Sequence, residues 1–146
     1  MQNHELILDK PHLQKMYTDF LTNEGYKHEL EENGDIAFRY RDCWYSIEIY
    51  DEDPVFGRLC RMIRAEFDDN TKIQAHIAAS KINGSSKLVR AYVRDEFKDK
   101  DFIVFVIGYL LTNPDDFAMH FKRMLHEMQA AYNEFNKIMN PQGKCH

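Results

Sequence analysis

The chain has 146 residues, of which 44% are hydrophobic and 29% charged, and its formal net charge is −5 at pH 7. This length and composition are typical of one globular domain with a single core. The acidic balance argues against general binding to a phosphate backbone, which requires a basic surface, so we expect no nucleic-acid partner.

The first element predicted is a short amphipathic helix. Pro11 suits its start and Gly25 its end. Apolar residues repeat between them at steps of one, three and four: Leu13, Met16, Tyr17, Phe20 and Leu21. This spacing predicts a helix with one face toward the core.

Three strands are predicted next. Residues 26–32, 35–41 and 43–50 each alternate apolar and polar side chains, which is typical of half-buried strands. Asn33-Gly34 is a strong hairpin signal between the first two, and Asp42 leaves only a tight link between the second and third. We expect a three-stranded antiparallel meander.

Residues 51–67 fit two patterns. Asp53-Pro54 could cap a helix, because the apolar residues after it fall near helical spacing. These residues are Phe56, Leu59, Cys60, Ile63 and Phe67. Residues 58–66 also alternate as a strand would. The pattern alone favours the helix and leaves the strand open.

A second helix is predicted from Asp68-Asp69-Asn70, which offer N-caps, to Asn83, with Gly84 as its stop. Its apolar side chains form two nearly opposite groups. Ile73 and Ile77 form one group, and Ala75, Ala78, Ala79 and Ile82 form the other. A helix that is apolar on two sides usually contacts two partners.

The remaining elements are two strands and a long helix. Residues 88–94 and 101–111 are predicted strands joined by a charged loop over 95–100, and Asn113-Pro114 suits the start of a helix. Its apolar stripe comprises Phe117, Phe121, Met124, Leu125, Met128, Tyr132, Phe135 and Ile138. The last strand would span about 36 Å. The helix would span about 37 Å, so we expect it to lie along the sheet.

Several of these segments resemble the YbjN family of candidate bacterial sensory transduction regulators. Asp53-Pro54-Val55-Phe56 before Arg58-Leu59 is similar to the family's acidic-Pro-x-aromatic start of a strand. Residues 75–83 are similar to its Ala-x-x-Ala-Ala-Asn-x-aliphatic-Asn helix, with Ser80 where the family often has Asn. Residues 89–93 and 116–135 extend the resemblance over residues 13–138.

The resemblance implies that residues 58–66 are a fourth strand, and we adopt that assignment. We therefore predict an α+β fold in which helices pack on an antiparallel sheet of five to six strands, in the order α-β-β-β-β-α-β-β-α. The resemblance also implies a fold similar to type III secretion chaperones, and it carries over no catalytic residue. We expect a single YbjN-like domain over residues 1–146, with its core over about 12–138.

The cellular setting is inferred from what the sequence lacks. No secretory signal begins the chain, and its longest apolar run is shorter than the roughly 20 residues of a membrane-spanning helix. Cys43, Cys60 and Cys145 are odd in number and widely spaced, which favours reduced thiols. We expect a cytoplasmic protein with no membrane partner.

The sequence offers no constellation for catalysis, metal binding or a cofactor. The spacings of metal ligands in CxxC and HExxH motifs are missing, and His120 and His126 fall on different faces of the last helix. Cys145-His146 lies in a polar tail. Cys43 and Cys60 are in predicted strands, where free thiols usually pack in the core. We expect neither an enzyme, nor a metal site, nor a cofactor.

Arginines and aromatic residues form the first candidate surface. Alternation predicts that Arg39, Arg41, Trp44, Arg90, Tyr92 and Arg94 share the uncovered face of the sheet. Arginine and aromatic side chains dominate interface hot spots, so this face is a candidate platform for an acidic partner. The alternative is cross-strand pairing of these arginines with Glu29, Glu31 and Glu48 on a solvated face.

The second candidate surface is the helix over residues 68–83. Ala75, Ala78, Ala79 and Ile82 would allow close approach of a second copy or a partner. The alternative is a helix packed between the sheet and the last helix. We predict a non-enzymatic protein-binding or regulatory module that acts as a homodimer and holds a partner segment as a chaperone does. A small-ligand or nucleotide sensor that uses the arginine face is the alternative function.

Overall fold

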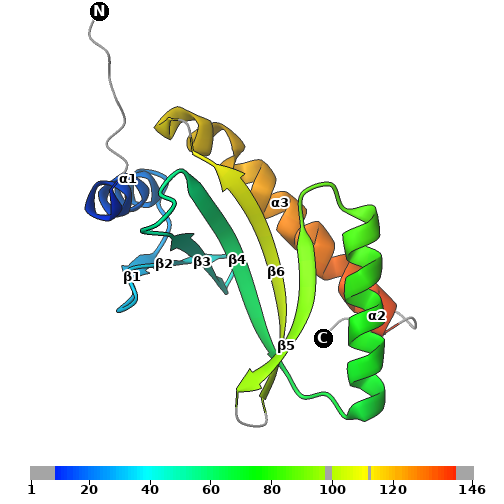
Figure 1. The fold of residues 1–146 in the computed structure, drawn as a ribbon. Helices are drawn as coiled ribbons and strands as arrows, with labels where there is room; N and C mark the ends of the chain where they lie inside the picture. The colour runs from blue at the N-terminus through cyan, green and yellow to red at the C-terminus, as the bar shows by residue number, and fades with distance from the viewer. Residues whose placement is uncertain (1–8, 98–99, 112, 141–146) are drawn as a thin grey trace, which may run out of the picture. The chain divides into compact units, whose positions relative to one another are not determined.

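The computed structural model of the chain describes residues 9–97, 100–111 and 113–140. The helices and strands of these residues follow the predicted order α-β-β-β-β-α-β-β-α (Figure 1). They are α1 (Lys10–Asn23), β1 (His28–Leu30), β2 (Ile36–Tyr40), β3 (Cys43–Ile49), β4 (Phe56–Ala65), α2 (Asp69–Ser85), β5 (Arg90–Phe97), β6 (Lys100–Leu110) and α3 (Pro114–Met139). The predicted α+β class is confirmed.

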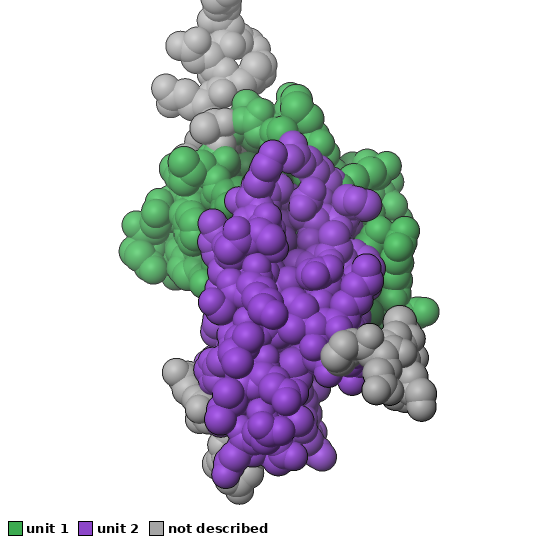
Figure 2. Space-filling view, turned by 90° about the vertical axis from the view of Figure 1, so that its right-hand side faces the viewer, with its two compact units in different colours: residues 1–60, 108–122 green, residues 61–107, 123–146 purple. Residues whose placement is uncertain are grey.

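The strands of the described residues form a six-stranded sheet in the order β1-β2-β3-β4-β6-β5. The neighbouring strands pair antiparallel, as predicted. The chain divides into two compact units, which are coloured separately in Figure 2. Unit 1 comprises Met1–Cys60 and Gly108–Lys122, and unit 2 comprises Arg61–Ile107 and Arg123–His146. A single domain over residues 1–146 stays a prediction.

In unit 1, α1 and the first hairpin form as the sequence predicts. The Asp9 carboxylate caps α1 by accepting a hydrogen bond of 2.9 Å from the backbone N–H of His12. Gly25 follows the helix in the left-handed conformation (φ 82°), which suits glycine at this position. Gly34 also has a positive φ of 90°, and its N–H donates to the Glu31 carbonyl at 2.9 Å, which closes the turn between β1 and β2.

Aromatic rings fill the core of unit 1. The Phe20 ring of α1 meets Phe117 and Phe121 of α3 edge-on, with centroids 5.2 and 5.1 Å apart. Phe38 of β2 lies 5.4 Å from Phe121. In unit 1 the start of the predicted stripe on α3 therefore packs on both the sheet and α1. Asn113 caps α3 as predicted, because its Oδ1 accepts a hydrogen bond of 3.0 Å from the backbone N–H of Asp116.

Residues 56–65 are a strand, so the helix that the pattern alone favoured is wrong. In β4, Cys60 pairs with Ser46 and Arg58 pairs with Glu48 of β3. Leu59 and Cys60 are both buried although neighbouring side chains of a strand point to opposite faces. Apolar residues on both faces of an inner strand imitate the spacing of a helix, which explains the wrong prediction.

In unit 2, the bounds of several elements differ slightly from the predicted ones. Asp68 caps α2 by accepting a hydrogen bond of 2.8 Å from the backbone N–H of Thr71. Gly84 lies inside the last turn of α2, which ends at Ser85, and so does not stop the helix. The predicted loop over 95–100 is shorter, because β5 reaches Phe97 and β6 begins at Lys100; residues 98–99 lie outside the described residues.

In unit 2, the side chain of Asn83 hydrogen-bonds to the backbone of the edge strand β5. β5 is the last strand in the sheet order, and α2 packs against it. The Asn83 amide of α2 donates to the Ala91 carbonyl at 2.9 Å and accepts from the Ala91 N–H at 2.7 Å. Asn83 thus makes the two backbone bonds that a further strand would make at this position.

Candidate functional site

The hairpin between β2 and β3 carries three of the predicted site residues. Arg41 and Asp42 form its two-residue turn and both have positive φ angles, 50° and 62°. This is the conformation that matches the twist of the flanking strands in a tight hairpin. The turn sets the register that places Arg39 directly opposite Trp44. We call Arg39, Arg41 and Trp44 the hairpin cluster.

The members of the hairpin cluster are held in place but remain accessible. The Arg39 guanidinium lies 5.6 Å from the centroid of the Trp44 ring, and it also donates to the Asp42 carbonyl at 3.2 Å. The Arg41 guanidinium lies 5.3 Å from the Tyr40 ring. Trp44 keeps 43% of its surface exposed, and the side chain of Arg39 keeps 37%. A cation stacked on a ring at an exposed site is stabilised by about 0.5–1 kcal/mol.

Charge at the hairpin cluster is locally positive in a chain whose formal net charge is −5. The Arg39 N–H donates to the Lys27 carbonyl at 2.8 Å, so Lys27 lies beside Arg39 on the neighbouring chain segment. The Asp42 carboxylate lies 3.7 Å from the Arg39 guanidinium. It is fully exposed, so water and salt weaken the attraction between these two charges. The hairpin cluster therefore suits an acidic partner.

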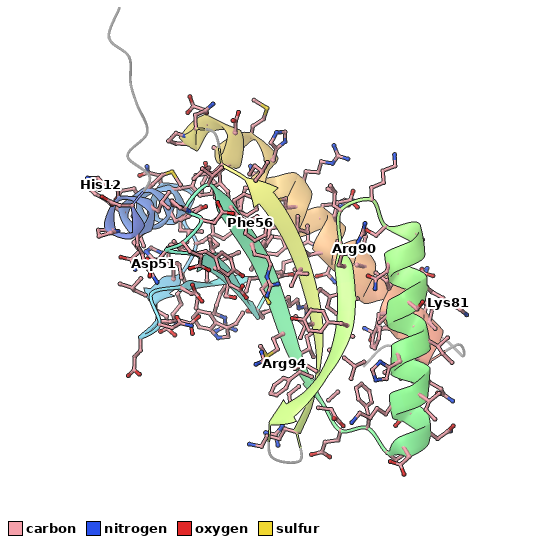
Figure 3. All side chains as sticks on the ribbon, viewed as in Figure 1. His12, Asp51, Phe56, Lys81, Arg90 and Arg94 are labelled. Carbon is pink, nitrogen blue, oxygen red and sulfur yellow. The ribbon has the colours of Figure 1, made fainter. Side chains whose placement is uncertain are left out.

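The other predicted platform residues lie in unit 2. Arg90, which Figure 3 labels on β5, donates to the carbonyls of Ser86 and Val89 at 3.1 and 2.9 Å. Its guanidinium is therefore hydrogen-bonded to the segment that connects α2 to β5. Tyr92 is 38% exposed and Arg94 is half-buried. A single platform formed by both groups of residues stays a prediction; Arg39 and Trp44 contact each other, whereas the Arg41 guanidinium lies over Tyr40.

Of the three glutamates in the cross-strand alternative, Glu48 forms an ion pair across strands, but its partner is Arg58, which is not one of the predicted platform arginines. Glu48 lies opposite Arg58, and the Arg58 Nε is 3.0 Å from its carboxylate. The Tyr50 hydroxyl also donates to Glu48. Glu29 lies opposite Ala37 instead. Burial raises the pKa of Glu31, with the neighbouring carboxylates of Asp35 and Glu29 adding to the shift.

The second predicted surface, on α2, faces the interior of unit 2. Ala75, Ala78, Ala79 and Ile82 are buried, which is what the alternative of a packed helix requires. The exposed apolar side chains of α2 belong to the opposite group: Ile73 is 61% exposed and Ile77 is 50% exposed. A dimer or partner contact through α2 stays a prediction, and Ile73 and Ile77 are the residues that are accessible for it.

The Cys60 thiol is a poor candidate for a nucleophile. Cys60 is buried, and burial raises the pKa of its thiol to about 11, so the thiol is protonated at neutral pH. Within the described parts of the chain, no group of three His, Cys, Asp or Glu side chains could hold a metal ion. His120 and His126 are both exposed on α3, and Cys145-His146 lies outside the described residues. None of the helices described here is long and apolar enough to cross a bilayer.

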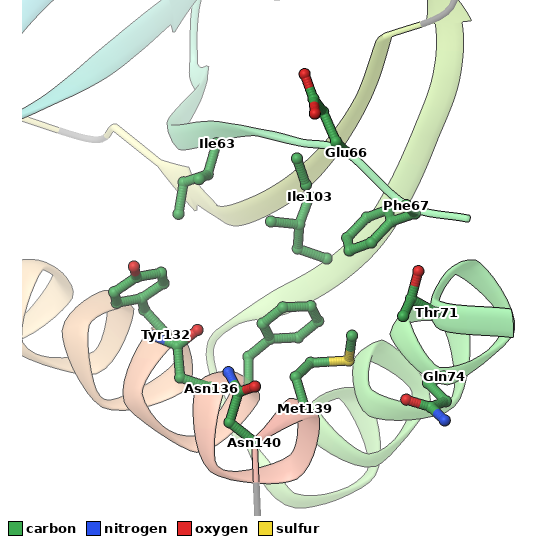
Figure 4. A pocket seen from close by; sticks show the side chains of 12 residues that line it. Ile63, Glu66, Phe67, Thr71, Gln74, Ile103, Tyr132, Asn136, Met139 and Asn140 are labelled. Carbon is green, nitrogen blue, oxygen red and sulfur yellow. The ribbon is translucent and has the colours of Figure 1, made fainter. Parts of the chain in front are cut away.

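A groove in unit 2 was missed by the sequence analysis. It has a volume of about 300 Å³ and lies among the end of β4, the first half of α2 and the end of α3 (Figure 4). Its lining residues are Ile63, Ala65, Glu66, Phe67, Thr71, Gln74, Ile103, Tyr132, Phe135, Asn136, Met139 and Asn140. The sequence feature that could have indicated this groove is the apolar stripe on α3, which continues to Met139, one residue beyond its predicted end.

The three helices and the six-stranded sheet of the described residues define this chain as an α+β protein. Its structure superposes on the crystal structure of YbjN, a candidate transcription regulator from E. coli, with a TM-score of 0.67, 14% identity, and coverage of 81% of this chain and 86% of that chain. It is also similar to an uncharacterized protein from Methanothermobacter thermautotrophicus, with a TM-score of 0.62, 7% identity, and coverage of 90% and 99%.

These comparisons confirm the resemblance to YbjN at the level of the fold. No protein-family profile matches the chain. No curated protein sequence matches it either. At identities of 14% and 7%, the similarity does not transfer a binding site or an activity.

Proposed function

We propose that this chain is a non-enzymatic regulatory module that binds an acidic segment of a partner protein through the hairpin cluster. The exposed stack of Arg39 on Trp44 carries the proposal. Tryptophan and arginine are the residues that most often dominate the binding energy of an interface. The stack also holds the arginine in position before binding, which lowers the entropy lost when the complex forms.

Two further observations support a regulatory role over a catalytic one. The similar structure of YbjN belongs to a candidate transcription regulator. The buried Cys60 thiol is protonated at neutral pH and so is a poor nucleophile. The proposed module holds an extended partner segment as a chaperone does, without changing it chemically.

Trp44 allows a direct test because it is the only tryptophan in the chain. A twelve-residue peptide rich in Glu and Leu is added to the protein, and the tryptophan fluorescence is followed. We expect saturable quenching that weakens as salt is raised, because ions screen attraction between exposed charges. A matched peptide in which Lys replaces Glu should produce no saturable change.

The test variant is Arg39→Glu, which reverses one charge of the hairpin cluster. It should weaken binding of the acidic peptide about tenfold or more, which corresponds to about 1.4 kcal/mol. Arg64→Glu is the matched control, since Arg64 is an exposed arginine on β4 of unit 2. Equal affinity of the two variants, or equal quenching by both peptides, would contradict the proposal. Stabilisation by nucleotides in a thermal-shift screen would favour a ligand sensor instead.

The proposal includes a homodimer. The exposed Ile73 and Ile77 on α2 are the side chains that we assign to its contact. Light scattering over a range of concentrations should show a dimer that Ile73→Glu converts to a monomer. A wild-type chain that stays monomeric at high concentration would remove this part of the proposal and leave the hairpin cluster unaffected.

A further inference from the structure

The groove in unit 2 has an apolar interior built from three elements. Ile103 of β6 and Phe135 of α3 are buried and form its floor. Ile63, Phe67 and Met139 are half-buried and form its walls (Figure 4). These side chains present aliphatic, aromatic and thioether groups to the space of about 300 Å³ between them. The interior therefore favours an apolar or aromatic group.

The aromatic side of the groove is held rigidly before any ligand arrives. The buried Arg61 guanidinium lies over the Tyr132 ring, 4.1 Å from its centroid. The Phe105 ring meets Tyr132 and Phe135 edge-on, with centroids 6.2 and 5.8 Å apart. A ring that enters the groove thus meets aromatic surfaces that are already fixed in place, which lowers the entropy lost on binding.

The rim of the groove is polar and carries little charge. Its neutral groups come from α2 and α3, and they are Thr71, Gln74, Asn136 and Asn140. Hydroxyl and amide groups both donate and accept hydrogen bonds, so they match the N–H and C=O groups of a peptide backbone. Glu66 is the one charged residue among those described that line the groove, and Figure 4 shows its exposed side chain directed away from Met139 and Tyr132.

The charges near the groove decide between classes of ligand. None of the described residues that line the groove is a cation. The nearby Lys72 of α2 is paired with Asp101 at 3.2 Å. A fatty acid or a nucleotide would therefore bring a negative charge to a groove whose described lining residues include Glu66 and no lysine or arginine. A positively charged group beside the apolar one is the complementary arrangement.

We propose that this groove binds a linear segment of a partner protein that inserts one aromatic side chain and places a lysine or arginine next to it, against Glu66. The volume of about 300 Å³ accommodates one such side chain, and it is at the lower limit for sites that enclose a whole small molecule. The inference rests on the proposed function as a protein-binding module. It adds a second contact in unit 2, with the opposite charge preference from the hairpin cluster.

Short blocked peptides provide the test. The probes are Ac-Gly-Lys-Phe-Gly-NH2 and its matched partners with Glu in place of Lys or Ala in place of Phe. Methyl NMR signals of Ile63, Ile103 and Met139 report on the groove. We expect saturable shifts with the Lys-Phe peptide, at least fivefold weaker binding of the Glu-Phe peptide, and no saturation with the Lys-Ala peptide. Equal responses to all three peptides would overturn the proposal.

Two variants test the contacts. Glu66→Lys changes an exposed side chain and should reverse the preference between the Lys-Phe and Glu-Phe peptides. Ile63→Glu should abolish the shifts, whereas Met62→Glu, on the neighbouring exposed side chain of β4 outside the groove, should leave them unchanged. An unchanged preference in Glu66→Lys would overturn the proposal even if Ile63→Glu failed to fold.

Other occupants are separate outcomes of the same experiment. Saturable shifts of the groove methyl signals with dodecanoate or ATP, and none with the Lys-Phe peptide, would overturn the proposal in favour of a small ligand. Methyl shifts that depend on protein concentration without any peptide would assign the groove to a second copy of the chain. Quenching of Trp44 by the acidic peptide is measured in parallel, so failure of the groove and failure of the hairpin cluster can be distinguished.

Discussion

Replacing Gly57 by alanine tests a close approach in unit 1 between a glycine of β4 and an aromatic ring of β6. A Cβ at Gly57 of β4 would lie 2.5 Å from Cζ and 2.6 Å from the hydroxyl oxygen of Tyr109 on β6. Real Cβ atoms do not approach other atoms this closely, so the Tyr109 ring has to move. Tyr109 is not free to do so without loss, because its hydroxyl is hydrogen-bonded to the Tyr17 hydroxyl of α1 at 2.8 Å.

The expected destabilisation follows from three terms. Overpacking in a well-packed region costs about 1–3 kcal/mol, and loss of the hydrogen bond between the tyrosines costs about 1 kcal/mol. Alanine in a strand recovers about 0.5–1 kcal/mol relative to glycine because it restricts the unfolded chain. We therefore expect Gly57→Ala to lower the free energy of unfolding by about 1–3 kcal/mol. Urea denaturation measures this difference.

A double-mutant cycle separates this clash from other effects of alanine. In a Tyr109→Ala background the obstructing ring is gone, so Gly57→Ala should be neutral or slightly stabilising. Gly84→Ala is the matched control, because a Cβ at Gly84 meets no atom within 4 Å and the residue lies in α2. It should stabilise the protein by about 0.5–1 kcal/mol. The same cost for Gly57→Ala in both backgrounds would refute the reasoning.

Three further predictions concern single side chains. Asn83→Leu leaves the N–H and C=O of Ala91 without their side-chain partner, so it should cost about 1–3 kcal/mol and speed hydrogen exchange of the Ala91 amide, measured by NMR. Burial raises the pKa of Asp35, so its ionised form is disfavoured in the folded state, and the contribution of Asp35 to the free energy of unfolding should fall as pH rises from about 4 through that raised value. In Asp35→Asn, which keeps an acceptor for the Ile49 N–H, this fall should disappear from urea denaturation curves at different pH; an unchanged pH profile would contradict it. Iodoacetamide should modify Cys60 at least about tenfold more slowly in the folded chain than in urea at pH 8, as followed by peptide mass spectrometry.

The elements that the sequence predicts correctly are those with local causes. α3 combines a capping Asn113, a proline at its first position and a stripe of apolar residues, all of which lie within the helix or next to it. The two hairpins from β1 to β3 are likewise set by the short turns at Gly34 and at Arg41-Asp42. β4 has no such local cause. It is a strand because it pairs with β3, and pairing between strands cannot be seen in the pattern of one segment.

The candidate sites also differ in whether local sequence patterns or long-range packing form them. Alternation in the sequence predicts that Arg39 and Trp44 share a face of the sheet, and the register set by the tight turn brings the two side chains into contact. The groove is formed by residues that are distant in the chain, from Ile63 to Asn140, and no local pattern predicts it. The two apolar sides of α2 were visible, but which side faces β5 depends on the packing of unit 2.

The bond pair between Asn83 and Ala91 has a consequence for the behaviour of the protein at high concentration. An unpaired outer strand is a template on which a strand of another molecule can assemble, and this is a common first step toward aggregates. An intruding strand at β5 would have to displace an amide that belongs to the same chain and is therefore always close by. The competition favours the tethered amide at all but very high protein concentrations. Loss of this one side chain should consequently show itself first as reduced solubility on storage.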